Sequence, residues 1–200
     1  MLRNSFSVLG AFALILVLFS APTSAATNAK AFVKEMGDKA FSSLSEEGIS
    51  DEERITRFKN LLSEAFDLPR IARFTLGRYW RTASEAQKTE FVTLFEKFVI
   101  QSYANRFQDL SGQKFVIVQS REVSSSQSLV LSKIQIPGKP SVKVNWRVRM
   151  KDAKHKVIDV IIEGISMSVT QRDEFVSVIR QTGGKVGGLI NALRKKTSSN

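Results

Sequence analysis

A stretch of high apolar and aromatic content near the middle of the chain constrains the fold more than any other feature. It runs from Phe66 to Phe107 and reads FDLPRIARFTLGRYWRTASEAQKTEFVTLFEKFVIQSYANRF. Its second half places apolar side chains at steps of three and four, the spacing of one face of an α-helix. This is more apolar surface than one helix face normally needs, so we expect the rest of the protein to cover it. The apolar positions of this face are Phe91, Leu94, Phe95, Phe98, Val99, Tyr103 and Phe107.

Local signals divide the same stretch into two helices. Ser84 and Gln87 have the spacing of a capping box, which predicts the start of the longer helix at this point. Pro69 suits the first turn of a shorter helix that ends near Gly77. The two helices are therefore expected to meet at Trp80.

Two further helices are predicted before this stretch. Residues Ala29–Leu44 carry apolar side chains at helical spacing and indicate one amphipathic helix. Ser50 with Glu53 has the spacing of a second capping box, and the apolar residues from Ile55 to Phe66 form the stripe of the helix that follows. The chain up to Leu110 is therefore mainly helical.

The apolar period changes from near four to two after Ser111 and Gly112, which indicates a change from helices to a sheet. Turn residues and short links separate the segments that follow, so we expect neighbouring strands to pair as an antiparallel meander. Gly164 interrupts the last segment, where a bulge or bend would let a long strand curve. The four predicted strands are Lys114–Val123, Ser128–Ile136, Val142–Met150 and Val157–Val169.

The third predicted strand alternates apolar and polar residues along its whole length. Its apolar face includes Val144, Trp146 and Val148, whereas the opposite face includes Arg147 and Arg149. One face of the sheet is therefore expected to be apolar and the other cationic.

The chain returns to helix at its end. Thr170 with Asp173 predicts the start of a short helix, and Gly183 with Gly184 predicts its end. A last amphipathic segment covers residues 186–193. Helices first, sheet next and short helices last predict an α+β fold with a four-stranded antiparallel sheet.

The N-terminus has the features of a secretory signal peptide. An apolar run from Val8 to Phe19 follows Arg3, and small residues precede a cleavage point after Ala25 or Ala26. We therefore predict a signal peptide over residues 1–26 and one domain over residues 27–200, a length that suits a single core. The chain has no cysteine, which excludes disulfides, thiolate metal sites and a lipoprotein anchor.

The positive charge of the chain lies in its second half. Residues 27–110 hold 13 basic and 13 acidic side chains, whereas residues 111–200 hold 16 basic and 6 acidic ones. Such a basic surface indicates either a solvated face or an anionic partner, namely nucleic acid or anionic lipid headgroups. The export signal argues against nucleic acid, and no nucleic-acid-binding motif is present.

Enzymatic alternatives have little support in the sequence. In the strand region, the candidates for acid and base catalysis are His155, Asp159 and Glu163. A second histidine, a GxSxG elbow and an HExxH motif are all missing from the sequence. The glycines between Gly183 and Gly188 lack the spacing of a phosphate-binding loop and fit helix termination better. We therefore predict that the protein is not an enzyme and needs no cofactor or metal.

Several short phrases give the chain a resemblance to the MlaC family, also called toluene-tolerance proteins, from about Ala29 to Lys195. They are Leu68-Pro69, Leu76-Gly77 followed by Trp80, the strand phrase DVIIEGISM from Asp159 to Met167, and Arg172 followed by Phe175. The chain departs from the usual pattern at His155-Lys156 and at Ser168–Arg172. Both departures resemble the hopanoid-associated HpnM branch.

The resemblance implies a periplasmic lipid carrier with an NTF2-like cone, in which helices wrap the sheet around an apolar cavity. It implies a phospholipid or hopanoid ligand, an inner-membrane ABC transporter complex with a membrane-anchored receiving subunit, and an outer-membrane lipoprotein partner. Lys143, Arg147 and Arg149 are the candidates for headgroup contacts. From face and family, the expected lipid-binding residues are Phe74, Trp80, Phe91, Phe95, Phe98, Tyr103, Val144, Trp146, Val148, Val160, Ile162 and Met167.

Overall fold

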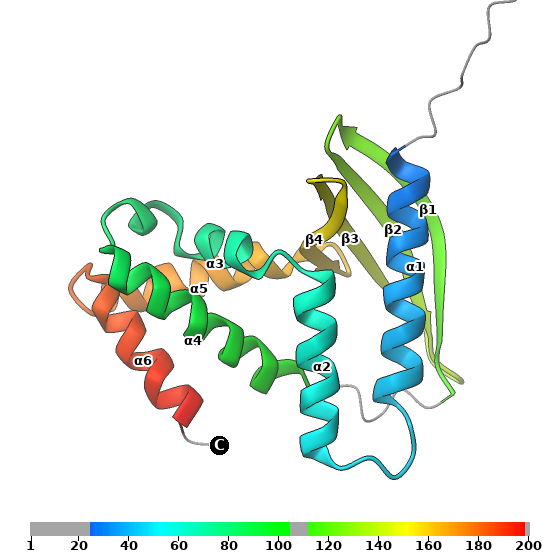
Figure 1. Ribbon diagram of the computed structural model, residues 1–200, viewed down its shortest axis with the longest axis horizontal. Coiled ribbons are helices and arrows are strands. Elements are labelled where there is room, and N and C mark those ends of the chain that lie inside the picture. Colours follow the sequence, from blue (N-terminus) through cyan, green and yellow to red (C-terminus); the bar gives the residue numbers. More distant parts are fainter. Residues whose placement is uncertain (1–24, 105–111, 199–200) are drawn as a thin grey trace, which may run out of the picture.

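The computed structural model describes residues 25–104 and 112–198 (Figure 1). The predicted signal segment lies outside these residues, apart from Ala25 and Ala26, with which the first helix begins. Phe107, at the end of the predicted central stripe, also lies outside them.

The order of the elements is helices, then a sheet, then two helices, so the predicted α+β fold is confirmed. The described elements are α1 (Ala25–Leu44), α2 (Asp51–Ala65), α3 (Leu68–Leu76), the 3-10 helix η1 (Gly77–Arg81), α4 (Glu85–Tyr103), β1 (Lys114–Ser124), β2 (Gln127–Gln135), β3 (Val142–Lys151), β4 (Lys154–Ile162), β5 (Ile165–Ser166), α5 (Met167–Gln181) and α6 (Val186–Ser198).

Side-chain caps fix where the helices begin. The Ser50 hydroxyl accepts a hydrogen bond from the Glu53 amide at 3.1 Å, which starts α2 where the sequence predicts it. At α4, the hydroxyl of Ser84 accepts from the amide of Gln87, and the Gln87 side chain accepts from the amide of Ser84. This reciprocal pair confirms the predicted capping box.

The sheet is antiparallel, with its strands in the order β1-β2-β3-β4-β5. The predicted bounds of the fourth strand were wrong, because β4 ends at Ile162. Glu163 and Gly164, with φ of 48° and 86°, turn the chain into the short strand β5, which the sequence did not predict. The hydroxyl of Ser166 then accepts from the amide of Val169, so α5 begins at Met167 rather than near Thr170.

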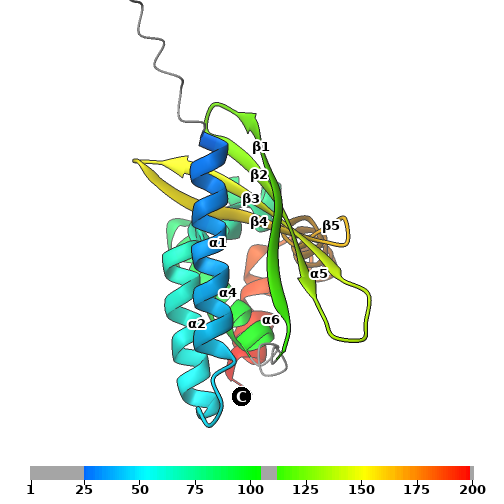
Figure 2. The same cartoon turned by 90° about the vertical axis from the view of Figure 1, so that its right-hand side faces the viewer.

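One face of the sheet, the inner face, carries the apolar side chains. The strand register sets Val130 of β2 and Val160 of β4 beside Trp146 of β3, and it sets Ile162 beside Val144. Helix α1 runs along this face (Figure 2), with its closest contacts to β1 and β2. Helix α1 also meets Val148 of β3 and His155 of β4, and the rest of the inner surface of these two strands is left to other elements.

The buried apolar side chains form two separate clusters. A small cluster between α1 and the sheet contains Val33, Val130 and Val148, all almost fully buried. A larger cluster joins the remaining helices, and at its centre the fully buried Phe91 of α4 meets Phe175 of α5 edge to face, with ring centroids 5.8 Å apart. Figure 1 shows the corresponding arrangement, with α3 to α6 gathered on the far side of α2 from α1, while α3 and the start of α5 reach β4.

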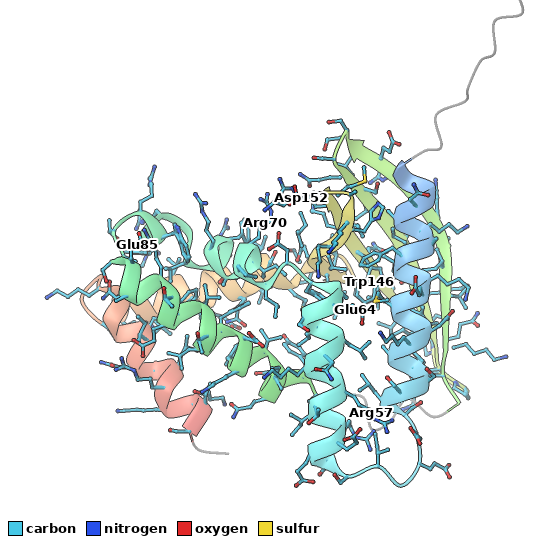
Figure 3. The ribbon with its side chains drawn as sticks, viewed as in Figure 1. Arg57, Glu64, Arg70, Glu85, Trp146 and Asp152 are labelled. Carbon is cyan, nitrogen blue, oxygen red and sulfur yellow. The ribbon has the colours of Figure 1, made fainter. Side chains whose placement is uncertain are left out.

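Basic side chains tie α2 to its neighbours. Arg54 and Arg57 donate hydrogen bonds to the carbonyls of Leu44 and Ser43 at the end of α1. Figure 3 shows Arg57 on the side of α2 that faces the end of α1. At the other end of α2, the Lys156 ammonium of β4 donates to the carbonyl of Ser63 at 2.9 Å. These hydrogen bonds satisfy carbonyl groups that have no backbone partner at the ends of helices. They also hold α2 between α1 and β4.

The central position of Phe91 predicts a large loss of stability on its truncation. We expect Phe91→Ala to lower the free energy of unfolding by about 3–5 kcal/mol, because it removes a buried ring and leaves a cavity. Urea unfolding followed by circular dichroism measures the change. Thr93→Ala on the exposed face of the same helix is the control. Equal unfolding midpoints for the two variants would contradict the central role of Phe91.

Candidate functional site

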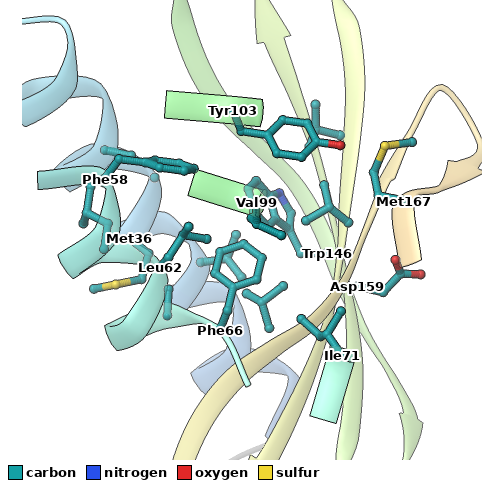
Figure 4. A pocket seen from close by; sticks show the side chains of 18 of the residues that line it. Met36, Phe58, Leu62, Phe66, Ile71, Val99, Tyr103, Trp146, Asp159 and Met167 are labelled. Carbon is teal, nitrogen blue, oxygen red and sulfur yellow. The ribbon is translucent and has the colours of Figure 1, made fainter. Parts of the chain in front are cut away.

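An apolar cavity of about 320 Å³ lies between the sheet and the helices. Figure 4 shows its wall, with Phe58, Leu62 and Phe66 on one side and Trp146 on the sheet side. Its volume falls in the range of cavities that bind small molecules, which are commonly lined by apolar and aromatic side chains. Members of both buried clusters line it, among them Val33 of the small cluster and Phe95 of the larger one.

The wall of the cavity comes from distant parts of the chain. Helices α1 and α2 contribute their apolar stripes, the sheet contributes its inner face, and α3, α4 and α5 each contribute a few side chains. Main lining residues are Met36, Ala40, Phe41, Phe58, Leu61, Leu62, Phe66, Ile71, Phe95, Val99, Tyr103, Phe115, Ile134, Val144, Trp146, Val157, Val160, Ile162 and Met167.

The polar part of the tryptophan in the wall has a partner. Trp146 Nε1 donates to the hydroxyl of Ser132 at 2.9 Å, and Ser132 in turn donates to the carbonyl of Val144. The indole therefore presents apolar surface to the cavity, and its N–H group is not left without a hydrogen-bond partner.

Polar side chains lie at one end of the lining, near the start of α5. The buried carboxylate of Asp159 accepts a hydrogen bond from Ser166 Oγ at 2.7 Å and from the amide of Ser168 at 3.1 Å. These bonds attach the N-terminus of α5 to β4. Thr75, Ser168 and Gln171 line the cavity as well. This polar end differs from the otherwise apolar wall.

The candidates for acid and base chemistry do not come together. His155 stacks on Phe32 of α1, with ring centroids 5.8 Å apart, and does not line the cavity. Glu163 lies in the turn after β4, where its carboxylate accepts from the amide of Lys143. Residues 25–104 and 112–198 contain no group of three His, Asp or Glu side chains that could hold a metal ion.

Seven of the twelve residues that the sequence predicts for lipid contacts line the cavity. They come from α4, β3, β4 and the start of α5. Figure 4 places Tyr103, Trp146 and Met167 around it. The seven are Phe95, Tyr103, Val144, Trp146, Val160, Ile162 and Met167.

The other five predicted residues lie away from the cavity. Phe74 is on the outer side of α3 and 41% exposed, and Trp80 lies in η1 beneath basic side chains. Phe91 and Phe98 pack on the aromatic ring of α5 in the helical cluster. Val148 is buried in the cluster between α1 and the sheet. Helical spacing places such residues on one stripe but does not say which neighbour that stripe meets.

The three predicted headgroup cations also lie away from the cavity. Along β3, Lys143, Arg147 and Arg149 alternate with Val144 and Trp146, which line the cavity. Successive side chains of a strand point to opposite faces, so these cations lie on the outer face of the sheet. They are not placed to meet a ligand inside the cavity.

Sequence reasoning did not assign the lining residues of α1 and α2. Met36 and Phe41 of α1 and Phe58, Leu62 and Phe66 of α2 or its end all contribute. Their helical spacing was visible, but the same pattern occurs in any amphipathic helix that packs on a filled core. The sequence offered one signal for a cavity: two consecutive helices both carry many large apolar residues and are followed by a sheet with one apolar face.

No helix in the described parts of the chain is both long enough and apolar enough to cross a bilayer. The described helices instead bury their apolar faces against one another, against the sheet or around the cavity.

Known proteins resemble this chain in sequence and in fold. The binding protein MlaC of the intermembrane phospholipid transport system of Haemophilus influenzae is 24% identical over 205 residues, covering 98% of this chain and 94% of that protein. A phospholipid-binding protein from Ralstonia solanacearum, solved in complex with a phospholipid, has the same fold. It matches with a TM-score of 0.77 at 23% identity, covering 85% of this chain and 97% of that one. The model of the family described as MlaC protein matches residues 34–195, and the chain therefore belongs to that family.

Proposed function

We propose that this protein is a carrier that holds the acyl chains of a phospholipid in its cavity and moves the lipid between membranes. The observation that carries the proposal is the apolar wall between the inner face of the sheet and helices α1 and α2. The name of the Haemophilus influenzae relative and the ligand of the Ralstonia solanacearum structure support the same lipid class.

The energetics of lipid burial favour a carrier over an enzyme that releases its product into water. Each buried methylene is worth about 0.8 kcal/mol relative to water, so two acyl chains contribute more than about 20 kcal/mol. This exceeds the range in which non-covalent binding from water saturates. Escape into water is therefore negligible. Exchange is nearly balanced when the lipid passes directly from the cavity to a bilayer or to another apolar channel.

The cavity suggests how the ligand is oriented. Acyl chains fit against Val144, Trp146 and Ile162 of the sheet, with Phe58 and Leu62 of α2 on the opposite wall. The polar end, which contains Asp159, Ser168 and Gln171, suits the ester or hydroxyl groups of a lipid better than its tails. The headgroup lies at this end in our proposal.

The cellular setting that fits this function is the periplasm, reached through the predicted signal peptide. An inner-membrane ABC transporter complex with a membrane-anchored receiving subunit, and an outer-membrane lipoprotein, would supply and accept the lipid. No catalytic step is part of this function. A hopanoid is the alternative cargo, favoured by the sequence departures at His155-Lys156 and Ser168–Arg172.

Identification of the cargo is the first test. We expect the protein, purified without detergent and extracted with organic solvent, to release a diacyl phospholipid detected by mass spectrometry. A hopanoid in the extract would select the alternative cargo. An extract without lipid would contradict the carrier function.

A charge in the wall should expel the cargo. We expect Val144→Asp to reduce the amount of co-purified lipid at least about tenfold, because a buried carboxylate disfavours acyl chains beside it. Lys97→Asp, on the exposed side of α4, introduces the same group and is the control. Equal lipid content in the two variants would contradict the assignment of this wall.

Filling the cavity without a charge provides an independent test. Ala40 of α1 lines the cavity, so Ala40→Phe places a ring in space that the acyl chains would occupy. We expect less lipid per protein than in wild type, while the thermal unfolding midpoint falls little. Ala86→Phe at the exposed start of α4 is the matched control and should keep its full lipid content.

A further inference from the structure

Two aromatic side chains predicted for the cavity lie elsewhere, since Phe74 is exposed on α3 and Trp80 is half-buried in η1, with part of its ring against the larger cluster. On α3, Ile71 and Thr75 line the cavity. Phe74 lies between them in the sequence but points away from the cavity and is 41% exposed. Basic side chains surround both aromatic rings. We call this region the arginine–aromatic surface, defined by Arg73, Phe74, Arg78, Tyr79, Trp80 and Arg172.

Each ring of this surface has a cation over it. Arg73 Cζ lies 5.9 Å and Lys88 Nζ 5.7 Å from the ring centroid of Trp80. Arg172 Cζ lies 5.2 Å from the ring centroid of Phe74. The same kind of contact pairs Arg78 with Tyr79 at 5.2 Å. Such pairs hold cations and rings together at the surface.

The local charge is strongly positive. Residues 68–84 contain four arginines and no acidic side chain. Among the residues that the structure describes, none of these four arginines forms an ion pair, although nearby Arg172 pairs with Asp173. Hydrogen bonding from Arg78 lowers the pKa of the Tyr79 hydroxyl, and Arg180 acts in the same direction. The surface therefore has unneutralised positive charge that an anionic partner can meet.

The combination of groups favours a lipid surface over an acidic protein. Guanidinium groups bind phosphates through paired hydrogen bonds, and aromatic rings with a polar edge are stable at the headgroup level of a bilayer. The outer face of the sheet is also basic at Arg147 and Arg149, but the described strands present no aromatic ring there. The two surfaces therefore share positive charge, but only the arginine–aromatic surface has aromatic rings. The outer face of the sheet can serve as a control for charge alone.

The position of the surface suits delivery of lipid. Helix α3 faces the cavity with Ile71 and Thr75 and faces outward with Arg73 and Phe74. The diameter of a helix is about 10 Å, so a membrane in contact with the outer side of α3 lies about this far from the cavity wall. In Figure 3, Arg70 and Glu85 mark the segment from α3 to the start of α4, away from Trp146 on the sheet.

We propose that the arginine–aromatic surface docks the protein on an anionic lipid bilayer. Arg73 and Arg78 contact lipid phosphates, and Phe74 and Trp80 enter the headgroup layer. The biological purpose of this docking rests on the carrier function proposed above, because direct contact with a bilayer lets the lipid transfer without crossing water.

Vesicle flotation tests the docking. The purified protein is mixed with vesicles of phosphatidylcholine alone, or of phosphatidylcholine and phosphatidylglycerol in equal parts, at low and at high salt. We expect binding to the vesicles that contain phosphatidylglycerol, and weaker binding as salt screens the charges. Absence of binding to these vesicles at low salt would overturn the proposal and leave an acidic protein as the partner.

Matched variants locate the binding surface. We expect the double variant Arg73→Gln, Arg78→Gln to reduce vesicle binding about tenfold. Arg147→Gln, Arg149→Gln removes the same charge from the sheet face and should bind like wild type. We expect Trp80→Ala to weaken the binding that remains at high salt. Equal losses in the two double variants would overturn the proposal, because binding would then follow net charge alone.

Lipid content measured on the same samples separates this proposal from the carrier function. The double variant Arg73→Gln, Arg78→Gln should retain its co-purified phospholipid and its unfolding midpoint, because both side chains are exposed. If the wild-type protein contains lipid but does not bind anionic vesicles, the docking proposal is refuted and the carrier function stands. A protein that binds vesicles but never contains lipid would refute the carrier function and leave docking intact.

Discussion

The separation of the two hydrophobic clusters is the constraint on which the rest of the structure depends. Helix α1 packs on the sheet through Val33, which meets Val130 of β2 and Val148 of β3, while Phe91 and Phe175 hold the distant helices to one another. The two clusters cover only part of the inner surface of β3 and β4, and Val144, Val160 and Ile162 belong to neither. Apolar surface is therefore left facing a cavity, which would be unfavourable in contact with water and is stabilised when apolar groups of a ligand fill it.

The connections around the cavity keep it open. Arg54 and Arg57 hold the end of α1 to α2, Lys156 attaches α2 to β4, and Asp159 attaches the start of α5 to the same strand. Each contact satisfies groups at a helix end, where backbone partners are missing. The polar bonds at the edges of the cavity thus resist the collapse that hydrophobic contact between its walls would otherwise favour.

The same helix can serve the cavity and the outer surface because its sides differ chemically. On α3, Ile71 and Thr75 contribute to the cavity, and Arg73 and Phe74 face outward. On β3, Val144 and Trp146 face the cavity and Arg147 faces outward. In the carrier that we propose, the apolar interior would retain the lipid and the arginine–aromatic surface would bring the protein to a bilayer. Because α3 is a single helix thick, the lipid-binding side and the outward side of this wall lie close together.

Local patterns in the sequence were sufficient for the class of the fold and for most elements. The N-cap at Ser50 and the capping box at Ser84 act within one turn, and the period-two alternation of β3 follows from strand geometry, so none of them depends on distant residues. The end of β4 was predicted too late, because apolar residues recur at Ile165, Met167 and Val169 although the backbone has already turned at Glu163 and Gly164.

The sequence by itself determined which side chains share a helix stripe or a strand face. The tertiary structure alone decided what each part of a stripe meets. Phe91 and Phe95 lie one turn apart on α4, yet Phe91 is enclosed by the helical cluster while Phe95 also reaches the cavity. The reason is physical: hydrophobic burial is not directional, so an apolar residue is equally satisfied by a neighbouring helix or by a ligand. The choice between them depends on where the other helices lie, and contacts between distant segments set those positions.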